Sequence, residues 1–496
     1  MTNRKILLLE PGYKNKYPPL GLMKIASYHG SYGKEDYVKF SKGEDRSLHD
    51  TGWDRIYVTT LFSFEWKVIE RCIDFAVSLV NGATNKIFVG GIAASLIQEA
   101  FLAEPKWRGI RFIKGLLDES PAISLRLDEF DGDFYSDDVT GTPIEDSIPD
   151  YSILDDIEYD YAVKDAYFAY ASRGCIRKCK FCGVPKLEGG QRRTPSLLPL
   201  IDGIKRRYGE KKDLILMDNN VVAAPNFREI IAEIRDLGFE RGAVLHRNGR
   251  SIGRRVDFNQ GVDARILCKS PEFLKQMSTI AIKPLRIAFD HIGVLKPYEQ
   301  SIRYAAEVGI NGLSNYMLYN FYDDPEDLYR RMYKNIELNE ELGIRIYSFP
   351  MRYQPVNLKD RSHIGQKWTR YWLRSFQVML QATHGIVSGA PAYFKNAYGA
   401  NIEEFFSLLW YPEKFLFNRR YYSELAGSGE LDEYLSLASC LTKAEKEELY
   451  NILSNKVRKD LRKDQGGRKK RGEGEREAKR REEVAGGLTR RREYSP

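Results

Sequence analysis

Apolar positions in the first 115 residues follow two spacings in turn, which predicts strands alternating with helices. The short apolar run at residues 6–9 is typical of a buried strand, whereas residues 64–80 repeat apolar positions at helical spacing. We expect strands at 5–11, 55–61, 86–89 and 109–114, and helices at 20–28, 64–80 and 93–103. This alternation favours an α/β fold, with a doubly wound, Rossmann-like domain over residues 1–115.

A second series of strands and helices covers residues 166–356. Strands are expected at 167–171, 214–217, 257–259, 285–289, 316–319 and 345–349, and helices at 196–208, 227–237, 271–277, 298–307 and 325–342. Six parallel strands with helices between them indicate a partial (β/α)6, TIM-like barrel with too few strands to close. Side chains at the carboxyl ends of its strands should then line a site.

The remaining segments differ in composition from both series. Residues 116–165 are rich in Asp, Pro and Ser and are predicted to be a linker. Residues 357–456 are rich in aromatic residues and helix formers and are predicted to be a helical C-terminal region. Residues 457–496 combine Lys, Arg, Glu and Gly with almost no apolar side chains, which is typical of a disordered charged tail.

Charge and hydropathy narrow the class of protein. No apolar run reaches the roughly 18–20 residues that span a bilayer, and the N-terminus lacks the pattern of a signal peptide, so we expect a cytoplasmic protein without a membrane partner. Segment 457–496 holds 15 Lys or Arg and 8 Asp or Glu, and it therefore carries nearly all of the formal +8 charge. The interspersed Glu residues favour a solvated tail over a nucleic-acid interface.

Three of the six cysteines are crowded into one basic, glycine-flanked loop. Cys175, Cys179 and Cys182 lie within eight positions, and the other three stand singly at Cys72, Cys268 and Cys440. In a reducing compartment such a trio indicates metal ligands, with Lys178 and Lys180 lowering the thiol pKa values. A structural zinc site would need a fourth ligand, and no second Cys or His pair follows. An iron–sulfur cluster with one open iron is therefore the leading interpretation.

The motif C-x3-C-x2-C, with Phe181 before its last cysteine and Ser172-Arg173-Gly174 before its first, resembles that of the radical S-adenosylmethionine (SAM) superfamily. The resemblance implies a [4Fe–4S] cluster held by the three cysteines, with SAM bound to its fourth iron. It also implies a one-electron reductant, flavodoxin- or ferredoxin-like, that drives cleavage of SAM to a 5′-deoxyadenosyl radical. The substrate that the radical would attack is unknown from the sequence.

The same resemblance suggests further cofactor-binding residues, while the catalytic residues remain unknown. Phe181 would pack near the adenine and Asp218 would lie near the SAM amine, although Asp218 could instead cap a helix. Gln260 and Arg265 follow the third strand and could meet the ribose or carboxylate, with a packing ion pair as the alternative for Arg265. Other polar residues follow strands four to six, at Asp290, His291, Asn320 and Arg352.

Residues 1–115 resemble the cobalamin-binding domain that precedes many radical SAM cores. The matching pieces are Glu10-Pro11, the Pro-Pro-Leu-Gly turn at 18–21, and Gly90-Gly91. The Asp-x-His-x-x-Gly motif is absent, and neither His29 nor His49 has its context, so cobalamin binding stays open. Bound cobalamin would imply methyl transfer. The alternatives are a nucleic-acid-binding protein with a structural cluster and a non-catalytic cobalamin-domain sensor.

Overall fold

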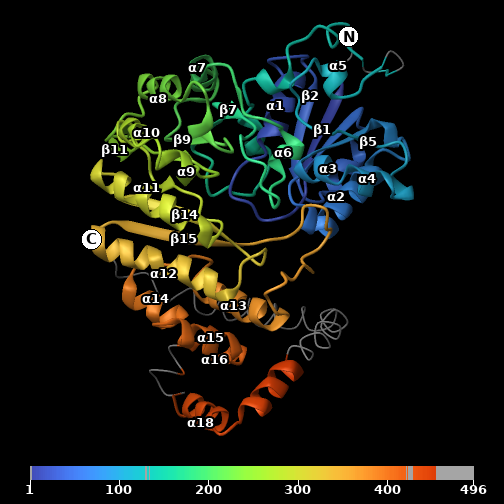
Figure 1. Ribbon diagram of the computed structural model, residues 1–496. Helices are drawn as coiled ribbons and strands as arrows, with labels where there is room; N and C mark the ends of the chain where they lie inside the picture. Colours follow the sequence, from blue (N-terminus) through green and yellow to red (C-terminus); the bar gives the residue numbers. More distant parts are fainter. Residues whose placement is uncertain (1–2, 129–130, 133, 420–421, 423–427, 454–496) are drawn as a thin grey trace, which may run out of the picture. The chain divides into compact units, whose positions relative to one another are not determined.

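Five parallel strands near the N-terminus form one sheet in the computed structural model, which describes residues 3–128, 131–132, 134–419, 422 and 428–453. The strands are Lys5–Glu10 (β1), Tyr37–Lys42 (β2), Arg55–Thr60 (β3), Ile87–Gly91 (β4) and Arg111–Phe112 (β5). Their order is β2-β1-β3-β4-β5, and every pairing is parallel (Figure 1). The strand order reverses between β1 and β3, where ligands of such sheets usually bind.

Helices connect these strands, as the sequence predicts. They are Leu20–His29 (α1), Trp66–Leu79 (α2), Ile92–Leu96 (α3), Gln98–Leu102 (α4) and Pro121–Ser124 (α5). The single helix predicted at 93–103 is wrong: Ile97 leaves helical geometry, with φ −130° and ψ 36°, and divides it into α3 and α4. Side chains of β1, β3 and β4 pack against α2 to form the buried core, which includes Leu7, Ile56 and Ile73.

Six further parallel strands follow, close to the predicted positions. They are Ala166–Ala169 (β6), Asp213–Leu216 (β9), Val256–Phe258 (β12), Leu285–Arg286 (β13), Gly312–Tyr319 (β14) and Arg345–Arg352 (β15). They form two three-stranded sheets, ordered β12-β9-β6 and β13-β14-β15. Parallel bridges from Val256 to Ile282 and from Val262 to Ile287 join the segments around β12 and β13. The predicted α/β alternation is confirmed.

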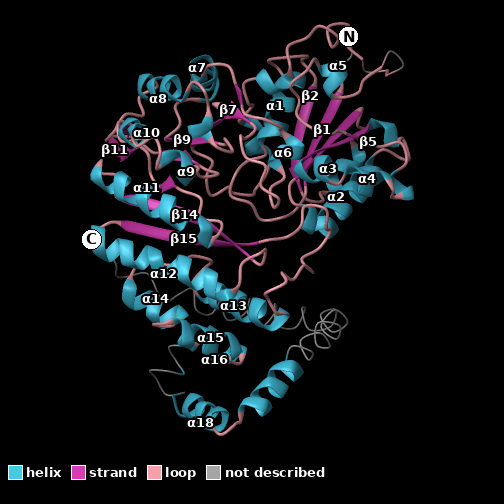
Figure 2. Ribbon diagram, in the orientation of Figure 1, coloured by secondary structure: helices cyan, strands magenta, loops and turns pink. Residues whose placement is uncertain are grey.

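The helices of this series are Leu197–Tyr208 (α7), Phe227–Asp236 (α8), Ala264–Leu267 (α9), Glu272–Met277 (α10), Leu295–Glu307 (α11) and Pro325–Leu342 (α12). The sequence determines the ends of α12 clearly. Asp324 caps its first turn by accepting a hydrogen bond from the Asp327 amide, and Gly343 ends it with φ +63°. α12 packs along β15 (Figure 2), so the long strand is covered on one face.

Several short elements lie outside the predictions. A hairpin joins Val244–Arg247 (β10) to Arg250–Gly253 (β11), and Ser172–Arg173 (β7) pairs antiparallel with Arg192–Arg193 (β8). Between β7 and β8 lies the one-turn helix Val184–Leu187 (α6). The predicted linker at 116–165 contains α5 and two short 3-10 helices.

The chain divides into two compact units: residues 1–365 with 386–394, and residues 366–385 with 395–496. Helices dominate the C-terminal region, as predicted: Arg370–Ala382 (α13), Pro391–Tyr398 (α14), Ile402–Trp410 (α15), Glu413–Phe417 (α16) and Ser428–Ser439 (α18). The predicted disordered tail, 457–496, lies outside the described residues. Within the described ranges, no helix is both long enough and apolar enough to cross a membrane.

Candidate functional site

The three crowded cysteines lie on one loop between β6 and α7. The loop leaves β7 at Gly174, whose backbone has φ +76°, and the amide of Cys175 donates to the Gly189 carbonyl over 3.3 Å. A Cβ at Gly174 would lie 2.1 Å from the Gly190 carbonyl oxygen. Only glycine therefore fits where the two ends of the loop meet.

N–H groups from the loop and from the next strand's end point at two of the sulfurs. The amide of Arg177 lies 3.4 Å from Cys175 Sγ, and the amide of Val184 lies 3.4 Å from Cys182 Sγ. Asn220 Nδ2, which follows β9, lies 3.8 Å from Cys175 Sγ. Donors of this kind stabilise anionic sulfur and influence the properties of bound clusters.

Burial and mutual repulsion disfavour free thiolates here. Burial raises the pKa of the Cys182 thiol to about 11, and the charges of the other two cysteines add to the rise. Burial also raises the pKa of the Cys179 thiol, and the negative charge of the Asp290 carboxylate raises it further. The predicted lowering by Lys178 and Lys180 is therefore wrong: the pKa values are raised, both lysine side chains are exposed, and neither is a main cause of these shifts. Three thiolates in this loop would need a bound cation.

The described residues contain no group of three or more His, Cys, Asp or Glu side chains that could together hold a single metal ion. The cysteines nevertheless supply the donor set of an iron–sulfur cluster, in which different cysteines bind different irons. Three thiols on one loop, two of them facing N–H donors, fit that group by their chemistry.

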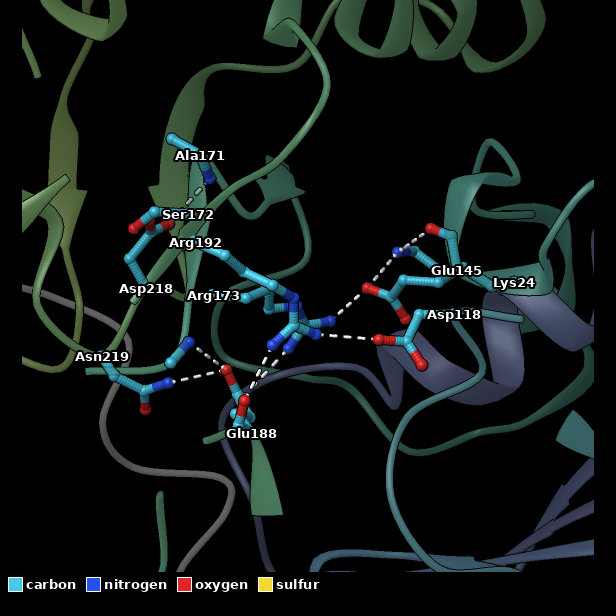
Figure 3. A network of polar contacts seen from close by, with 11 residues as sticks. Lys24, Asp118, Glu145, Ala171, Ser172, Arg173, Glu188, Arg192, Asp218 and Asn219 are labelled. Carbon is cyan, nitrogen blue, oxygen red and sulfur yellow. Dashed lines mark hydrogen bonds and ion pairs between the residues drawn. The ribbon is translucent and has the colours of Figure 1, made fainter. Parts of the chain in front are cut away.

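A buried network of charges supports the loop from behind (Figure 3). Arg173, one residue before Gly174, pairs with Glu145 and, over 3.2 Å, with Glu188. Glu145 also accepts a 2.9 Å hydrogen bond from Lys24 Nζ on α1. Glu188 accepts from the Gly174 amide over 2.8 Å and from Asn219 over 2.9 Å. The first half of the chain thus helps to fix the start of the cysteine loop.

Asp218, predicted near the SAM amine, lies two residues after β9 and is 2% exposed. Its carboxylate accepts hydrogen bonds from the Ala171 amide over 2.9 Å and from Ser172 Oγ over 2.6 Å (Figure 3). Burial raises its pKa to about 6, against the lowering effect of these bonds. Asp218 caps no helix: both contacts fix the strand that leads into the cysteine loop.

Arg265 pairs with Asp263 over 2.8 Å. Asp263 also pairs with Arg177 of the cysteine loop over 2.6 Å, and its amide donates to Asn220 Oδ1 over 3.3 Å. Although burial opposes it, hydrogen bonds from Arg265 and Arg177 hold the pKa of Asp263 below its ordinary range. Asp263 therefore ties the segment after β12 to the cysteine loop, a role that no sequence pattern predicts. Gln260 is exposed.

Phe181 lies against the ends of β14 and β15. Its ring meets Phe321 edge-on at 5.7 Å, and Phe321 in turn meets Tyr353 at 4.6 Å. The preceding Asn320 is fully buried with φ +69°. Asn320 Nδ2 donates to the carbonyls of Tyr353 and His363, each over 3.2 Å, so it holds together the two ends of segment 353–365.

That segment reaches the start of α2, directly after β3 of the N-terminal sheet. Lys359 Nζ lies 3.6 Å from the ring centre of Trp66. Arg361 pairs with Glu65 over 3.1 Å and lies 4.2 Å from the ring centre of Phe64. Side-chain contacts therefore link the cysteine loop, the ends of β14 and β15, and the segment after β3 within one unit of the chain.

The carboxyl edge of the first sheet combines filled and exposed parts. At the end of β1, Glu10 forms a buried 2.7 Å pair with Lys42 and also accepts a hydrogen bond from the Tyr161 hydroxyl. After β3 and β4, Phe62 and Ile92 are 44% and 40% exposed. Gly91, with φ +98°, packs so closely that a Cβ would lie 2.4 Å from the Thr60 carbonyl oxygen. Gly91 thus has a structural reason independent of any ligand, whereas a Cβ at Gly90 would make only an ordinary 3.8 Å contact with Ile113.

Neither histidine of this domain lies at that edge as a free ligand. His29 is fully buried, with Nδ1 2.8 Å from Asp36 and Nε2 2.8 Å from the Tyr57 hydroxyl. His49 is exposed and its ring meets Phe75 edge-on at 5.7 Å. These contacts agree with the absence of an axial-histidine motif in the sequence.

No protein-family model matches the chain, and no curated protein does so. Among solved structures, this chain is similar to the radical SAM methyltransferase TsrM from Kitasatospora setae, determined with tryptophan substrate and a SAM analogue bound. The match covers 72% of this chain and 76% of the TsrM chain, with 12% sequence identity and a TM-score of 0.48. TsrM with cobalamin and a [4Fe–4S] cluster gives 13% identity and TM-score 0.44 over 72% and 78%. SuiB of Streptococcus suis bound to SAM gives 13% identity and TM-score 0.29 over 44% and 48%.

Proposed function

We propose that this protein is a radical SAM enzyme in which Cys175, Cys179 and Cys182 hold a [4Fe–4S] cluster. The observation that carries the proposal is the C-x3-C-x2-C trio on one closed loop, directly after the first of six parallel strands. When bound, the cluster would supply the electron that cleaves SAM to a carbon radical, which then attacks the substrate. We further propose that the six strands form an open barrel around that reaction.

The chain's own residues hold the cluster loop in place and shield it. The amides of Arg177 and Val184 would offset negative charge on the sulfurs, and Asn220 would do the same from the neighbouring strand. Arg265 shares its partner Asp263 with Arg177 of the cysteine loop, and it would meet an anionic group such as the SAM carboxylate from there. Asp218 acts as a positioning residue through Ala171 and Ser172.

Anaerobic reconstitution with iron and sulfide tests the proposal. The purified protein should gain the broad visible absorbance of an iron–sulfur cluster and, with SAM and dithionite, should release 5′-deoxyadenosine. A Cys179→Ala variant should lose both signals, whereas the matched Cys268→Ala variant, which removes a lone half-buried thiol, should keep them. Turnover that persists in Cys179→Ala would defeat the assignment.

Cobalamin-dependent methyl transfer is the second candidate, and the exposed edge after β3 and β4 favours it. Phe62 and Ile92 present apolar side chains to solvent beside Gly91, which suits the face of a large flat ring. In the described part of this domain both histidines are engaged elsewhere, so such a ring would bind without an axial histidine. Its role would be to relay a methyl group.

Cobalamin retention tests this second candidate separately. After incubation with hydroxocobalamin and gel filtration, the full-length protein should carry the corrin absorbance. A Phe62→Ser variant should retain several-fold less, and the control Leu102→Ser, which alters another exposed apolar residue of the same domain, should behave as the native protein. Equal cobalamin retention by Phe62→Ser and Leu102→Ser would show that cobalamin does not bind at the edge after β3 and β4.

Two partner assignments complete the proposal. A flavodoxin- or ferredoxin-like protein would deliver the electron, and dithionite should substitute for it. The nucleic-acid alternative depends on segment 457–496, which lies outside the described residues, and deletion of that segment should leave RNA affinity unchanged if the tail is merely solvated. A sensor without catalysis would bind cobalamin and release no 5′-deoxyadenosine.

A further inference from the structure

One face of β14 and β15 carries aromatic side chains that are only half-buried. Along both strands, buried residues such as Met317 and Ile346 alternate with half-buried Tyr316, Tyr347 and Phe349. Tyr316 and Phe349 are direct neighbours across the parallel pairing, with ring centres 5.9 Å apart, and Tyr347 lies 5.5 Å from Phe349. The core of the protein covers one face of these strands, whereas the aromatic face remains partly accessible.

The charges beside this aromatic face neutralise each other. Arg286 of β13 forms a bidentate ion pair with Asp257 of β12, in which both hydrogen bonds are 2.7 Å long. The remaining guanidinium nitrogen of Arg286, Nη1, donates to Ser314 Oγ over 3.2 Å. The guanidinium lies 5.6 Å from the ring centre of Tyr316 and 5.7 Å from that of Phe349. A ligand at this place would therefore meet a flat, polarisable surface with no net charge.

A turn of the N-terminal domain brings two more residues to the same place. The Tyr17 hydroxyl donates to Asn259 over 2.7 Å, and its ring meets Phe168 edge-on at 6.2 Å. Lys16 is exposed, and its ammonium lies 5.7 Å from the ring centre of Phe349. No carboxylate in the described ranges pairs with Lys16. One positive charge thus stands free at the rim of the aromatic face.

We propose that this face, made of Tyr316, Tyr347, Phe349, Tyr17 and Lys16, binds the substrate and that the substrate is a small aromatic carboxylate. The rings would stack on the flat part of the ligand, and Lys16 would pair with its carboxylate. A single free cation suits one negative charge and does not suit the regular phosphates of a nucleic acid. That this ligand is the substrate rests on the proposed radical SAM function, whereas the binding site itself rests on the contacts described above.

Calorimetry on the full-length protein, before and after cluster reconstitution, tests the site with three probes. We expect 2-naphthoate to bind more tightly than 2-naphthalenemethanol, which lacks the charge, and than cyclohexanecarboxylate, which lacks the flat ring. Lys16→Gln should weaken naphthoate binding about 3- to 5-fold, as expected for an exposed ion pair, and should leave the alcohol unaffected. Phe349→Leu should weaken both aromatic probes about 5-fold.

Lys14→Gln is the matched control, because Lys14 is an exposed lysine two positions earlier on the same turn. Equal effects of Lys14→Gln and Lys16→Gln, or naphthoate binding that Phe349→Leu does not alter, would overturn the proposed site. Absence of saturable naphthoate binding would overturn it too. The binding measurement needs neither cluster nor SAM, so its failure differs from failure of the radical SAM proposal, which shows as missing absorbance and missing 5′-deoxyadenosine.

Discussion

Replacing Glu145 by alanine should destabilise the first unit strongly, because two buried cations depend on it. Lys24 and Arg173 are only 8% and 7% exposed in their side chains, and both pair with this one carboxylate. Removing one member of a buried pair costs about 3–5 kcal/mol, since the remaining charge stays desolvated. Glu145 is itself 20% exposed, and Arg173 keeps Glu188, so we expect the lower end, about 3 kcal/mol.

The surface pair between Arg192 and Asp118 is the matched control, because it lies beside the same network and both side chains are more than 40% exposed (Figure 3). Asp118→Ala should cost about 0–1 kcal/mol. Urea unfolding followed by tryptophan fluorescence gives both values, and the larger loss should lower the midpoint by roughly 1 M. Midpoints that agree for Glu145→Ala and Asp118→Ala would refute the reasoning.

The pH dependence of the Glu145→Ala deficit adds a second check. Burial lowers the pKa of Lys24, and Glu145 opposes that lowering in the native protein. Without Glu145 the folded-state pKa falls further below the unfolded value, so the unfolded state binds more protons and stability rises with pH. The deficit should therefore narrow as the pH rises towards about 10, the ordinary pKa of lysine.

Three further outcomes are expected. Asp218 has a folded pKa of about 6, above its unfolded value, so the unfolded state loses its proton first. The stability of Asp218→Asn relative to the native protein should therefore rise by about 2 kcal/mol between pH 4 and pH 7 in urea unfolding. Gly174→Ala should abolish iron incorporation, because the new Cβ would collide with the backbone of Gly190. Gly189 also has a positive φ, but a Cβ there would have nothing within 4 Å. Gly189→Ala should therefore lower the unfolding free energy by only about 1–2 kcal/mol. Burial raises the pKa of Cys72 to about 12, so native protein should not react with Ellman's reagent at Cys72, whereas unfolded protein should.

Each of these has a result that contradicts it. A stability difference between native and Asp218→Asn protein that stays constant with pH would show that burial does not raise the pKa of the Asp218 carboxyl. Equal iron content in the Gly174→Ala and Gly189→Ala variants would show that the loop ends do not meet. Rapid labelling of Cys72 in native protein, identified by mass spectrometry, would contradict the packing of α2.

The parts of the fold that follow local periodicity could be predicted from the sequence. Every predicted strand of both series exists, because apolar runs flanked by turn residues report burial directly. The strand β2 was missed since its sequence, Tyr-Val-Lys-Phe-Ser-Lys, lies at the sheet edge and buries only Phe40 and Ser41. The hairpin of β10 and β11 was missed for a similar reason, as most of its side chains are exposed.

The site was predictable only where residue type and spacing carry the information. The cysteine trio is such a case. Asp218 was found by its place after a strand, but its partners, Ala171 and Ser172, depend on tertiary packing. Asp263 and Glu145 were missed because a single acidic residue in a loop looks like any solvated carboxylate, and their roles arise from arginines 86 and 28 positions away.

The dependence of the cysteine loop on Glu145 and Lys24 has a consequence for how the protein comes into being. Synthesis proceeds from the N-terminus, so the residues that brace the loop emerge from the ribosome before the loop does. A fragment starting at residue 166 would carry all three cysteines yet leave the Arg173 side chain without its Glu145 partner. Cluster insertion should therefore depend on the earlier half of the chain having already folded, and shortened versions should accumulate as iron-free protein.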